Sequence, residues 1–353
     1  MMSGTPTDFV VLSGFLGSGK TTLLERYLAT RSEGDTAVIV NDVGEVNIDG
    51  AVLALREGVP MATLSNGCVC CSLTNDLQAT VQALLQERQY SGMAPLRRVI
   101  LECSGISEPG AILRTLSGLA WLNMCVSVVT TYDASQTART DAMFELAAAQ
   151  LAAAHVVVLT KLDLVEGIVT DEVLEKVSQF APFAQLVVEP KPIRRAQLAF
   201  ECPAGKPDWA RLATEEEPMR RTSASSISTG AANHPRLGVF KVTFTEPLGW
   251  NTLEAWLENL VGYFDGRLLR MKGIVDLRDC SEPVLIQGVG PHVDMPRRIG
   301  SRTHTSSMVL IVRDATRDEV ASVEPRLPIK EISRQAARNP IRVRLPGGCS
   351  LPS

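Results

Sequence analysis

The chain has 353 residues, of which 45% are hydrophobic and 21% are charged, and its formal net charge is −4 at pH 7. This apolar content excludes a chain that is disordered throughout, and the length suffices for about two domains of ~150 residues each. The slightly negative charge, with no long basic run, argues against a nucleic-acid-binding protein and against a protein held at a membrane surface by basic residues.

No segment of the sequence is typical of a membrane span or of a signal peptide. The most apolar stretch, residues 146–159, is interrupted by Gln150 and His155, and it is shorter than the ~18 residues that a membrane helix needs. No basic segment precedes the first apolar run, so we expect a cytoplasmic protein without a signal peptide. With 8 cysteines in the whole chain, a scaffold built on disulfides is not expected.

The first part of the chain, residues 1–202, alternates short apolar runs with longer segments of helical spacing. Buried apolar strands that alternate with helices predict an α/β fold with a mainly parallel sheet. The expected strands are residues 9–13, 36–40, 99–102, 125–129, 156–160 and 186–188.

The composition changes between residues 203 and 235, where four prolines, three consecutive glutamates and a run rich in Ser and Thr predict a linker. Residues 236–325 then predict a second, smaller α+β domain. The tail, residues 326–353, is rich in Arg and Pro and is expected to be partly disordered. In the second domain we expect strands at 238–244, 267–277, 284–289 and 308–313 and helices at 253–261 and 316–323.

A phosphate-binding motif follows the first expected strand. Residues 14–21 match the pattern G-x-x-x-x-G-K-[ST], and they lie between an expected strand and an expected helix, as a P-loop does. The glycines let backbone N–H groups surround the phosphates, Lys20 reaches the β- and γ-phosphates, and the Thr21 hydroxyl binds Mg²⁺. The expected nucleotide-binding residues of this loop are Gly14, Gly17, Ser18, Gly19, Lys20, Thr21 and Thr22.

A base-recognition motif follows the strand expected at 156–160. Thr160, Lys161 and Asp163 would lie at the carboxyl end of the sheet, where nucleotides bind. The carboxylate of Asp163 can accept hydrogen bonds from the N1 and N2 groups of guanine, which adenine cannot donate. We therefore expect GTP rather than ATP, although Thr160 stands where the usual guanine motif has Asn, and a solvated turn would look similar.

Acidic residues follow two other strands at the same edge. Asp42 and Glu45 come after the second strand, and Glu102 ends the third. Acids there can orient Mg²⁺ or an attacking water, so we expect catalytic roles for Lys20, Asp42, Glu45 and Glu102. Glu102 also resembles a Walker-B acid that shares Mg²⁺ with Thr21, and Gly105 could sense the γ-phosphate. The alternative for residues 41–45 is a polar loop without a functional role.

Three cysteines lie within four residues, at positions 68, 70 and 71, just before an expected helix. Thiols near a helix N-terminus have lowered pKa values, and thiolates bind Zn²⁺ and related metals. We therefore expect Cys68, Cys70 and Cys71 to form a transition-metal site. Small buried side chains and redox chemistry are the alternatives.

Together these motifs resemble the CobW-type P-loop GTPases, a branch of the metallochaperone GTPases that is related to nickel-insertion factors for urease and hydrogenase. The resemblance spans residues 8–325, and the cysteine motif is its most specific mark. It rests on residues 14–22, 41–45 with Asp49, 66–72, 102–109 and 160–163, and in the second domain on 256–257, 270–273, 286–289 and 310–313.

The resemblance implies a P-loop GTPase domain over residues 1–202 and a CobW-like C-terminal domain over residues 236–325 that recognises a client. It implies GTP hydrolysis with Mg²⁺, coupled to the delivery of a transition metal, Zn²⁺ or Co²⁺, to a client metalloprotein. Asp42 stands where many members have Glu. His234 is the only histidine between the domains, where many members carry a histidine-rich run.

Two other functions stay open at this point. A GTPase that gates assembly of a cofactor enzyme without carrying metal would use the cysteines structurally. A small-molecule kinase would share the P-loop but would need an acceptor site, which we do not find in the sequence. The sequence leaves the metal, the client and the oligomeric state undetermined, and a homodimer is one way to complete the metal shell.

Overall fold

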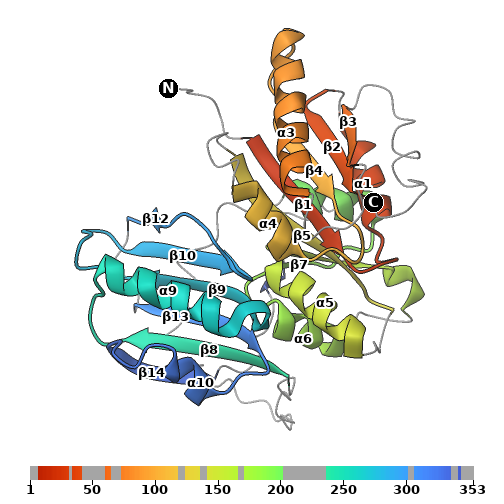
Figure 1. The fold of residues 1–353 in the computed structure, drawn as a ribbon. Coiled ribbons are helices and arrows are strands. Elements are labelled where there is room, and N and C mark those ends of the chain that lie inside the picture. The colour runs from red at the N-terminus through yellow and green to blue at the C-terminus, as the bar shows by residue number, and fades with distance from the viewer. Residues whose placement is uncertain are drawn as a thin grey trace, which may run out of the picture.

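The computed structural model of the chain describes residues 7–31, 34–41, 60–64, 73–117, 124–135, 141–165, 171–201, 236–300, 306–334 and 341–342. These residues form two sheets with their helices (Figure 1). Within these ranges, no helix is long and apolar enough to cross a membrane.

The first sheet has eight strands, and every neighbouring pair is parallel. This confirms the expected α/β fold with a parallel sheet. The strand order is β15-β7-β6-β5-β1-β4-β2-β3. The strands are β1 (Thr7–Gly14), β2 (Thr36–Asn41), β3 (Met61–Leu64), β4 (Arg98–Glu102), β5 (Met124–Asp133), β6 (Val156–Thr160), β7 (Gln185–Val187) and β15 (Ile341–Arg342).

Helices cover both faces of this sheet because alternate residues of its strands point to opposite sides. Phe9 and Val11 of β1 pack in one apolar cluster with α3 and α4, whereas Val10 and Leu12 pack in another with α1 and α7. Helices α5 and α6 pack on β6 on the same side as α3 and α4. The helices are α1 (Lys20–Leu28), α3 (Leu73–Tyr90), α4 (Pro109–Ser117), α5 (Asp141–Ala153), α6 (Asp171–Phe180) and α7 (Pro192–Glu201), with a short 3-10 helix η2 (Leu162–Leu164).

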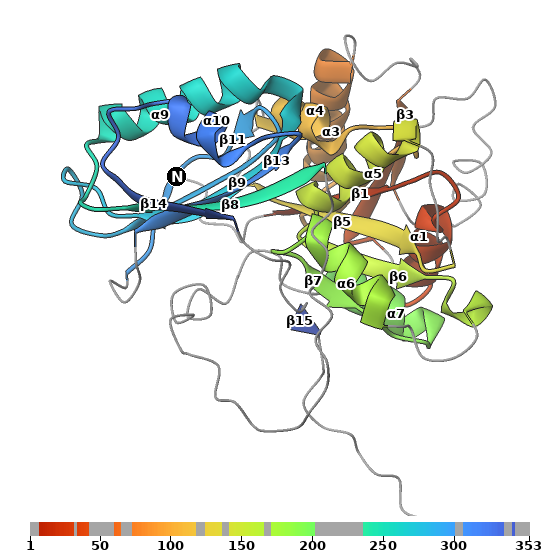
Figure 2. The ribbon, with the colours of Figure 1, turned by 90° about the horizontal axis from the view of Figure 1, so that it is seen from below.

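The second sheet is antiparallel, and α9 and α10 cover one of its faces (Figure 2). Trp256 of α9 lies at the centre of this domain's core, 1% exposed and edge-on to Phe244. The path of strands is β11-β10-β9-β13-β8-β14, with β12 paired to β10. The elements are β8 (Leu237–Phe244), α9 (Trp250–Phe264), η3 (Asp265–Arg267), β9 (Leu268–Val275), β10 (Val284–Val289), β11 (His292–Val293), β12 (Arg297–Arg298), β13 (Ser307–Arg313), α10 (Arg317–Ser322) and β14 (Ile329–Arg334).

The segment that we expected to be a tail contributes strands to both sheets. Within residues 326–353, β14 pairs antiparallel with β8, and β15 pairs parallel with β7 at the edge of the first sheet. The C-terminal sheet therefore extends past residue 325, and the chain returns to the first domain after it.

The uncovered face of the second sheet packs on the first domain. Leu237, Leu269 and Ile311 belong to the same apolar cluster as residues of α5 and α6, and Val289 packs with α3 and α4. Helices α4 and α5 consequently lie between the two sheets (Figure 1). This contact connects the second domain to the helices that adjoin the nucleotide-binding edge.

Candidate functional site

The P-loop lies between β1 and α1, as the sequence predicts. Gly14, Gly17 and Gly19 have φ angles of 140°, 71° and 89°, a region that residues with a Cβ atom rarely adopt. No side chain caps the start of α1, so its first N–H groups are available to a phosphate. The geometry is that of an anion-binding loop.

Lys20 is folded back over this loop. Its ammonium group donates to the backbone carbonyl oxygens of Gly14, at 3.0 Å, and of Phe15, at 3.2 Å. Only 8% of the residue is exposed. Lys20 thus holds its charge where the phosphates of a nucleotide would lie.

The two residues expected to hold Mg²⁺ are in contact with each other. The Thr21 hydroxyl donates to a carboxylate oxygen of Glu102 at 2.6 Å, and Glu102 is 4% exposed at the end of β4. Hydroxyl and carboxylate oxygens are the hard donors that Mg²⁺ prefers. The chemistry of this pair therefore fits the ion.

The base-recognition motif is connected to the P-loop through Thr160. Its hydroxyl lies 2.7 Å from the backbone carbonyl oxygen of Ser18 and 3.1 Å from that of Tyr132. Asp163 is exposed in η2, where its carboxylate is free to meet a base. The structure therefore brings Thr160 to the phosphate loop and leaves Asp163 on the surface.

Lys161 is held in a left-handed conformation, with φ of 53°. Its ammonium group lies 2.7 Å from a carboxylate oxygen of Asp133, which is 2% exposed. Burial opposes ionisation of Asp133, but the hydrogen bonds from Lys161 and Ser135 outweigh it and lower the pKa of this carboxyl group. The resulting ion pair fixes the loop that carries Asp163.

The turn after β4 lies directly against the P-loop. Its peptide N–H at Ser107 donates to the carbonyl oxygen of Ser104 at 3.0 Å. A Cβ atom on Gly105 would lie 2.5 Å from the backbone nitrogen of Leu16, so only glycine permits this approach. The turn that carries Gly105 therefore packs against the backbone of the P-loop.

One residue of this site was not expected from the sequence. The side-chain amide of Gln150, on α5, donates to the carbonyl oxygens of Gly105 and Ser107, each at 3.1 Å. The signal that could have identified it is its isolation, since Gln150 is the only polar residue between Leu146 and Ala154.

Several expected site residues lie outside the described part of the chain: Asp42, Glu45, Asp49, Cys68, Cys70 and Cys71. Their anchoring strands are nevertheless described. Strands β2 and β3 pair in parallel with Asn41 opposite Leu64, so the two strands end side by side at the carboxyl edge of the sheet. Among the described residues, no group of three or more His, Cys, Asp or Glu side chains could hold a metal ion.

Comparison with known proteins agrees with this geometry. Residues 8–188 match the family described as CobW/HypB/UreG, nucleotide-binding domain, and residues 237–323 match the cobalamin synthesis protein cobW C-terminal domain. The zinc chaperone YjiA of Escherichia coli K12 is 27% identical over 325 residues, which cover 89% of this chain and 96% of that protein.

Two other similarities concern shorter or more distant matches. The zinc-regulated GTPase metalloprotein activator 1 of Dictyostelium discoideum is 41% identical over 119 residues, covering 30% of this chain and 24% of that protein. The crystal structure of Zn(II)-bound YjiA GTPase from E. coli has a TM-score of 0.60 at 22% identity and covers 91% of this chain and 98% of that one, which shows the shared fold. The resemblance found in the motifs is confirmed: the chain belongs to the CobW/HypB/UreG family of P-loop GTPases.

Proposed function

We propose that this protein is a GTP-dependent metallochaperone that binds Zn²⁺ or Co²⁺ at Cys68, Cys70 and Cys71 and delivers it to a client metalloprotein. The observation that carries the proposal is the pairing of β2 with β3, in which Asn41 lies opposite Leu64. Cys68 is four residues beyond Leu64, so it can lie at most about 14 Å from the end of β3.

The nucleotide half of the proposal rests on described contacts. Lys20 donates to the Gly14 carbonyl oxygen of the P-loop, and Thr21, the next residue, donates to Glu102 at the end of β4. Thr21 and Glu102 would hold Mg²⁺, which when bound offsets the charge of the β- and γ-phosphates. Asp42 and Glu45 follow Asn41, the last residue of β2, by one and four positions in the sequence, and we assign them to the catalytic set with Lys20 and Glu102.

The metal half rests on sequence position. Cys70 and Cys71 precede α3, which begins at Leu73, and a helix N-terminus lowers thiol pKa values. Three thiolates leave one position of a four-coordinate shell open, to be completed by another residue, a water or the second chain of a homodimer. Relatives named zinc chaperones support this half of the proposal.

In this proposal the two domains have different functions. Residues 1–202 hydrolyse GTP, residues 203–235 link the domains, and residues 236–325 recognise the client. Strand β14, which ends at Arg334, pairs with β8 of this second domain. A cytoplasmic location stays a prediction.

A metal titration tests the proposal. Competitive Zn²⁺ and Co²⁺ titrations are run without nucleotide, with GDP and with a non-hydrolysable GTP analogue. The parent is compared with the triple variant Cys68→Ser, Cys70→Ser, Cys71→Ser and with the control Cys280→Ser, whose partly buried cysteine lies in the second domain. We expect the GTP analogue to tighten metal binding by about 5- to 150-fold, the range of typical coupling between two sites.

Two outcomes of the titration would contradict the proposal. Equal metal affinity in the three nucleotide states would favour the alternative, a GTPase that assembles a cofactor enzyme without carrying metal. Undiminished binding by the triple variant would remove the cysteines as ligands. Because coupling is reciprocal, metal must also tighten binding of the GTP analogue by the same factor.

A further inference from the structure

A buried glutamine supports the turn that faces the P-loop. Gln150 is 1% exposed, and its side-chain amide donates to the carbonyl oxygens of Gly105 and Ser107, each at 3.1 Å. Its backbone carbonyl oxygen accepts from the Thr130 hydroxyl at 3.0 Å. Burying a polar side chain in an otherwise apolar helix is unfavourable unless its hydrogen bonds are made, so the helix is tied to this turn.

The turn that Gln150 holds has little freedom of its own. The bond between Ser104 and Ser107 closes it, and Gly105 lies against the backbone of Leu16. A shift or rotation of α5 would therefore displace the peptide groups of Gly105 and Ser107 with respect to the P-loop. In the transfer of a phosphoryl group, such small displacements change the rate because catalysis depends on positioning.

The second domain holds the same helix at its carboxyl end. Arg270 of β9 donates from one guanidinium nitrogen to the carbonyl oxygens of Ala152 and Ala154, each at 2.9 Å. Arg270 is 2% exposed. A cation at this end also complements the dipole of the helix, so the second domain fixes α5 two residues away from Gln150.

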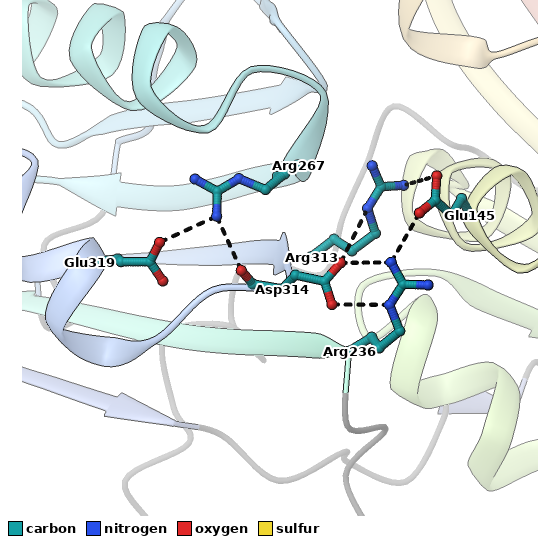
Figure 3. A network of polar contacts seen from close by, with 6 residues as sticks. All are labelled: Glu145, Arg236, Arg267, Arg313, Asp314 and Glu319. Atoms are coloured by element: carbon teal, nitrogen blue, oxygen red, sulfur yellow. Dashed lines mark hydrogen bonds and ion pairs between the residues drawn. The ribbon is translucent and has the colours of Figure 1, made fainter. Parts of the chain in front are cut away.

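An ion-pair network holds α5 a second time, at Glu145 (Figure 3). Glu145 precedes Gln150 in the helix, whereas Ala152 follows it. Glu145 lies 3.0 Å from Arg236 and 3.4 Å from Arg313. Arg236 is in turn paired with Asp314 at 2.8 Å. Both arginines belong to the second domain, so the contacts at Glu145 and at Ala152 bracket Gln150 from that domain.

We propose that Gln150 is a positioning residue for GTP hydrolysis, and that α5 connects it to the second domain, which thereby sets the hydrolysis rate. Gln150 acts by orienting the Ser104–Ser107 turn and does not touch the nucleotide. The inference uses only the GTPase activity of the family and is independent of the metal. A partner that binds the second domain would act on GTP hydrolysis by moving α5.

The first test replaces the amide. Gln150→Met keeps the length of the side chain and removes the donor. We expect kcat for GTP hydrolysis to fall by about tenfold or more, as for a displaced catalytic element, while the KM for GTP and the affinity for GDP stay within about twofold. GDP lacks the γ-phosphate that the turn faces, so its binding reports on the fold of the site. An unchanged kcat, or a parallel loss of GDP binding and thermal stability, would overturn the positioning role.

The second test acts from the surface and leaves Gln150 in place. Glu145→Gln removes the charge by which α5 pairs with Arg236 and Arg313, both of which keep their pairing with Asp314. The Glu145 side chain is 44% exposed, so we expect the fold to tolerate the change. Glu319→Gln is the matched control, because Glu319 pairs with Arg267 within the second domain at 3.3 Å. We expect Glu145→Gln to change kcat by about twofold to 30-fold, the usual size of a long-range coupling, and the control to leave it unchanged.

The double variant decides whether the effect passes through Gln150. If it does, Glu145→Gln has no further effect on kcat in the Gln150→Met protein, a non-additivity that a double-mutant cycle measures. Additive effects, or equal kcat values for Glu145→Gln and the parent, would overturn the connection to the second domain.

Discussion

The hydroxyl group of Thr160 lies 2.7 Å from the backbone carbonyl oxygen of Ser18 and joins the base-recognition loop to the P-loop. Asn is the usual residue at this position of the guanine motif, and a threonine cannot reproduce its amide. The structure shows that the smaller side chain still bridges the two loops, because Thr160 is 5% exposed at the end of β6, directly beside Gly19. A single donor therefore connects the loop after β6 to the P-loop.

Removing that donor should weaken nucleotide binding. Thr160→Val keeps the side-chain shape and leaves the Ser18 carbonyl oxygen without this bond, at a cost of about 1–3 kcal/mol for an unsatisfied buried group. We expect GDP and GTP affinity to fall by about fivefold or more. The measurement is a titration with a fluorescent nucleotide. Thr115→Val is the control, because this threonine of α4 is equally buried and its hydroxyl bonds within its own helix; equal losses in both variants would contradict the prediction.

Asp163→Asn should change which base is bound. The amide donates where the carboxylate accepted, so guanine loses its partner and xanthine gains one. We expect GTP affinity to fall by about tenfold or more, from the loss of at least one hydrogen bond to a charged group, and xanthosine triphosphate to bind better than GTP. Competition binding with GTP, ATP and xanthosine triphosphate measures this. The control is Asp318→Asn, an exposed aspartate of α10; a parent protein that binds ATP and GTP equally would refute base selection by Asp163.

Lys20→Ala should abolish turnover. The substitution removes the cation that lies within the phosphate loop, and transition-state charge is then uncompensated. We expect kcat to fall by about a hundredfold or more, as when a preorganised charge or donor is removed from an active site. Phosphate release with Mg²⁺ and GTP is the assay, and Lys330→Ala, on an exposed position of β14, is the control. Hydrolysis at the parental rate would show that the P-loop is misassigned.

The stability of the protein should respond to pH through Lys272 of β9, whose ammonium group lies 5.7 Å from the centre of the Phe183 ring in the first domain. Burial, with the charges of Arg270 and Arg297, lowers the pKa of Lys272 to about 7, whereas a lysine in the unfolded chain has a pKa of about 10.4. Between these values the unfolded chain binds a proton that the folded chain does not, so stability rises as pH rises from about 7 to about 10.

Lys272→Met removes the ammonium group that titrates, so the stability of the variant should depend less on pH than that of the parent. We expect the melting temperature of the variant to exceed that of the parent at pH 7.5 by about 4 °C or more, since 1 kcal/mol corresponds to about 4–8 °C in a domain of about 100 residues. The difference in melting temperature between the variant and the parent should become smaller at pH 9.5. Lys241→Met, at a partly exposed position of β8, is the control, and a gap that is equal at both pH values would contradict the pKa shift.

The parts of the site that were predictable are those encoded in consecutive residues. The P-loop needs glycines at fixed positions because its backbone adopts positive φ angles, and this requirement is visible in the sequence. The buried strands of the first sheet are continuous apolar runs because both faces are covered by helices. Because β6 is such an apolar run, Thr160 could be placed at its end and Asp163 in the loop that follows.

Other features depend on neighbours that are distant in sequence. Strand β3 has four residues and β15 has two, too few for a pattern, and each forms because an existing sheet edge supplies its hydrogen bonds. Arg270 reaches carbonyl groups 118 and 116 residues away, and Gln150 reaches the turn at Gly105. The sequence alone determined the fold class and the nucleotide chemistry, since both follow from local backbone and side-chain requirements. Only the tertiary structure decided which buried polar groups meet, because a hydrogen bond between distant segments depends on how the helices and sheets pack.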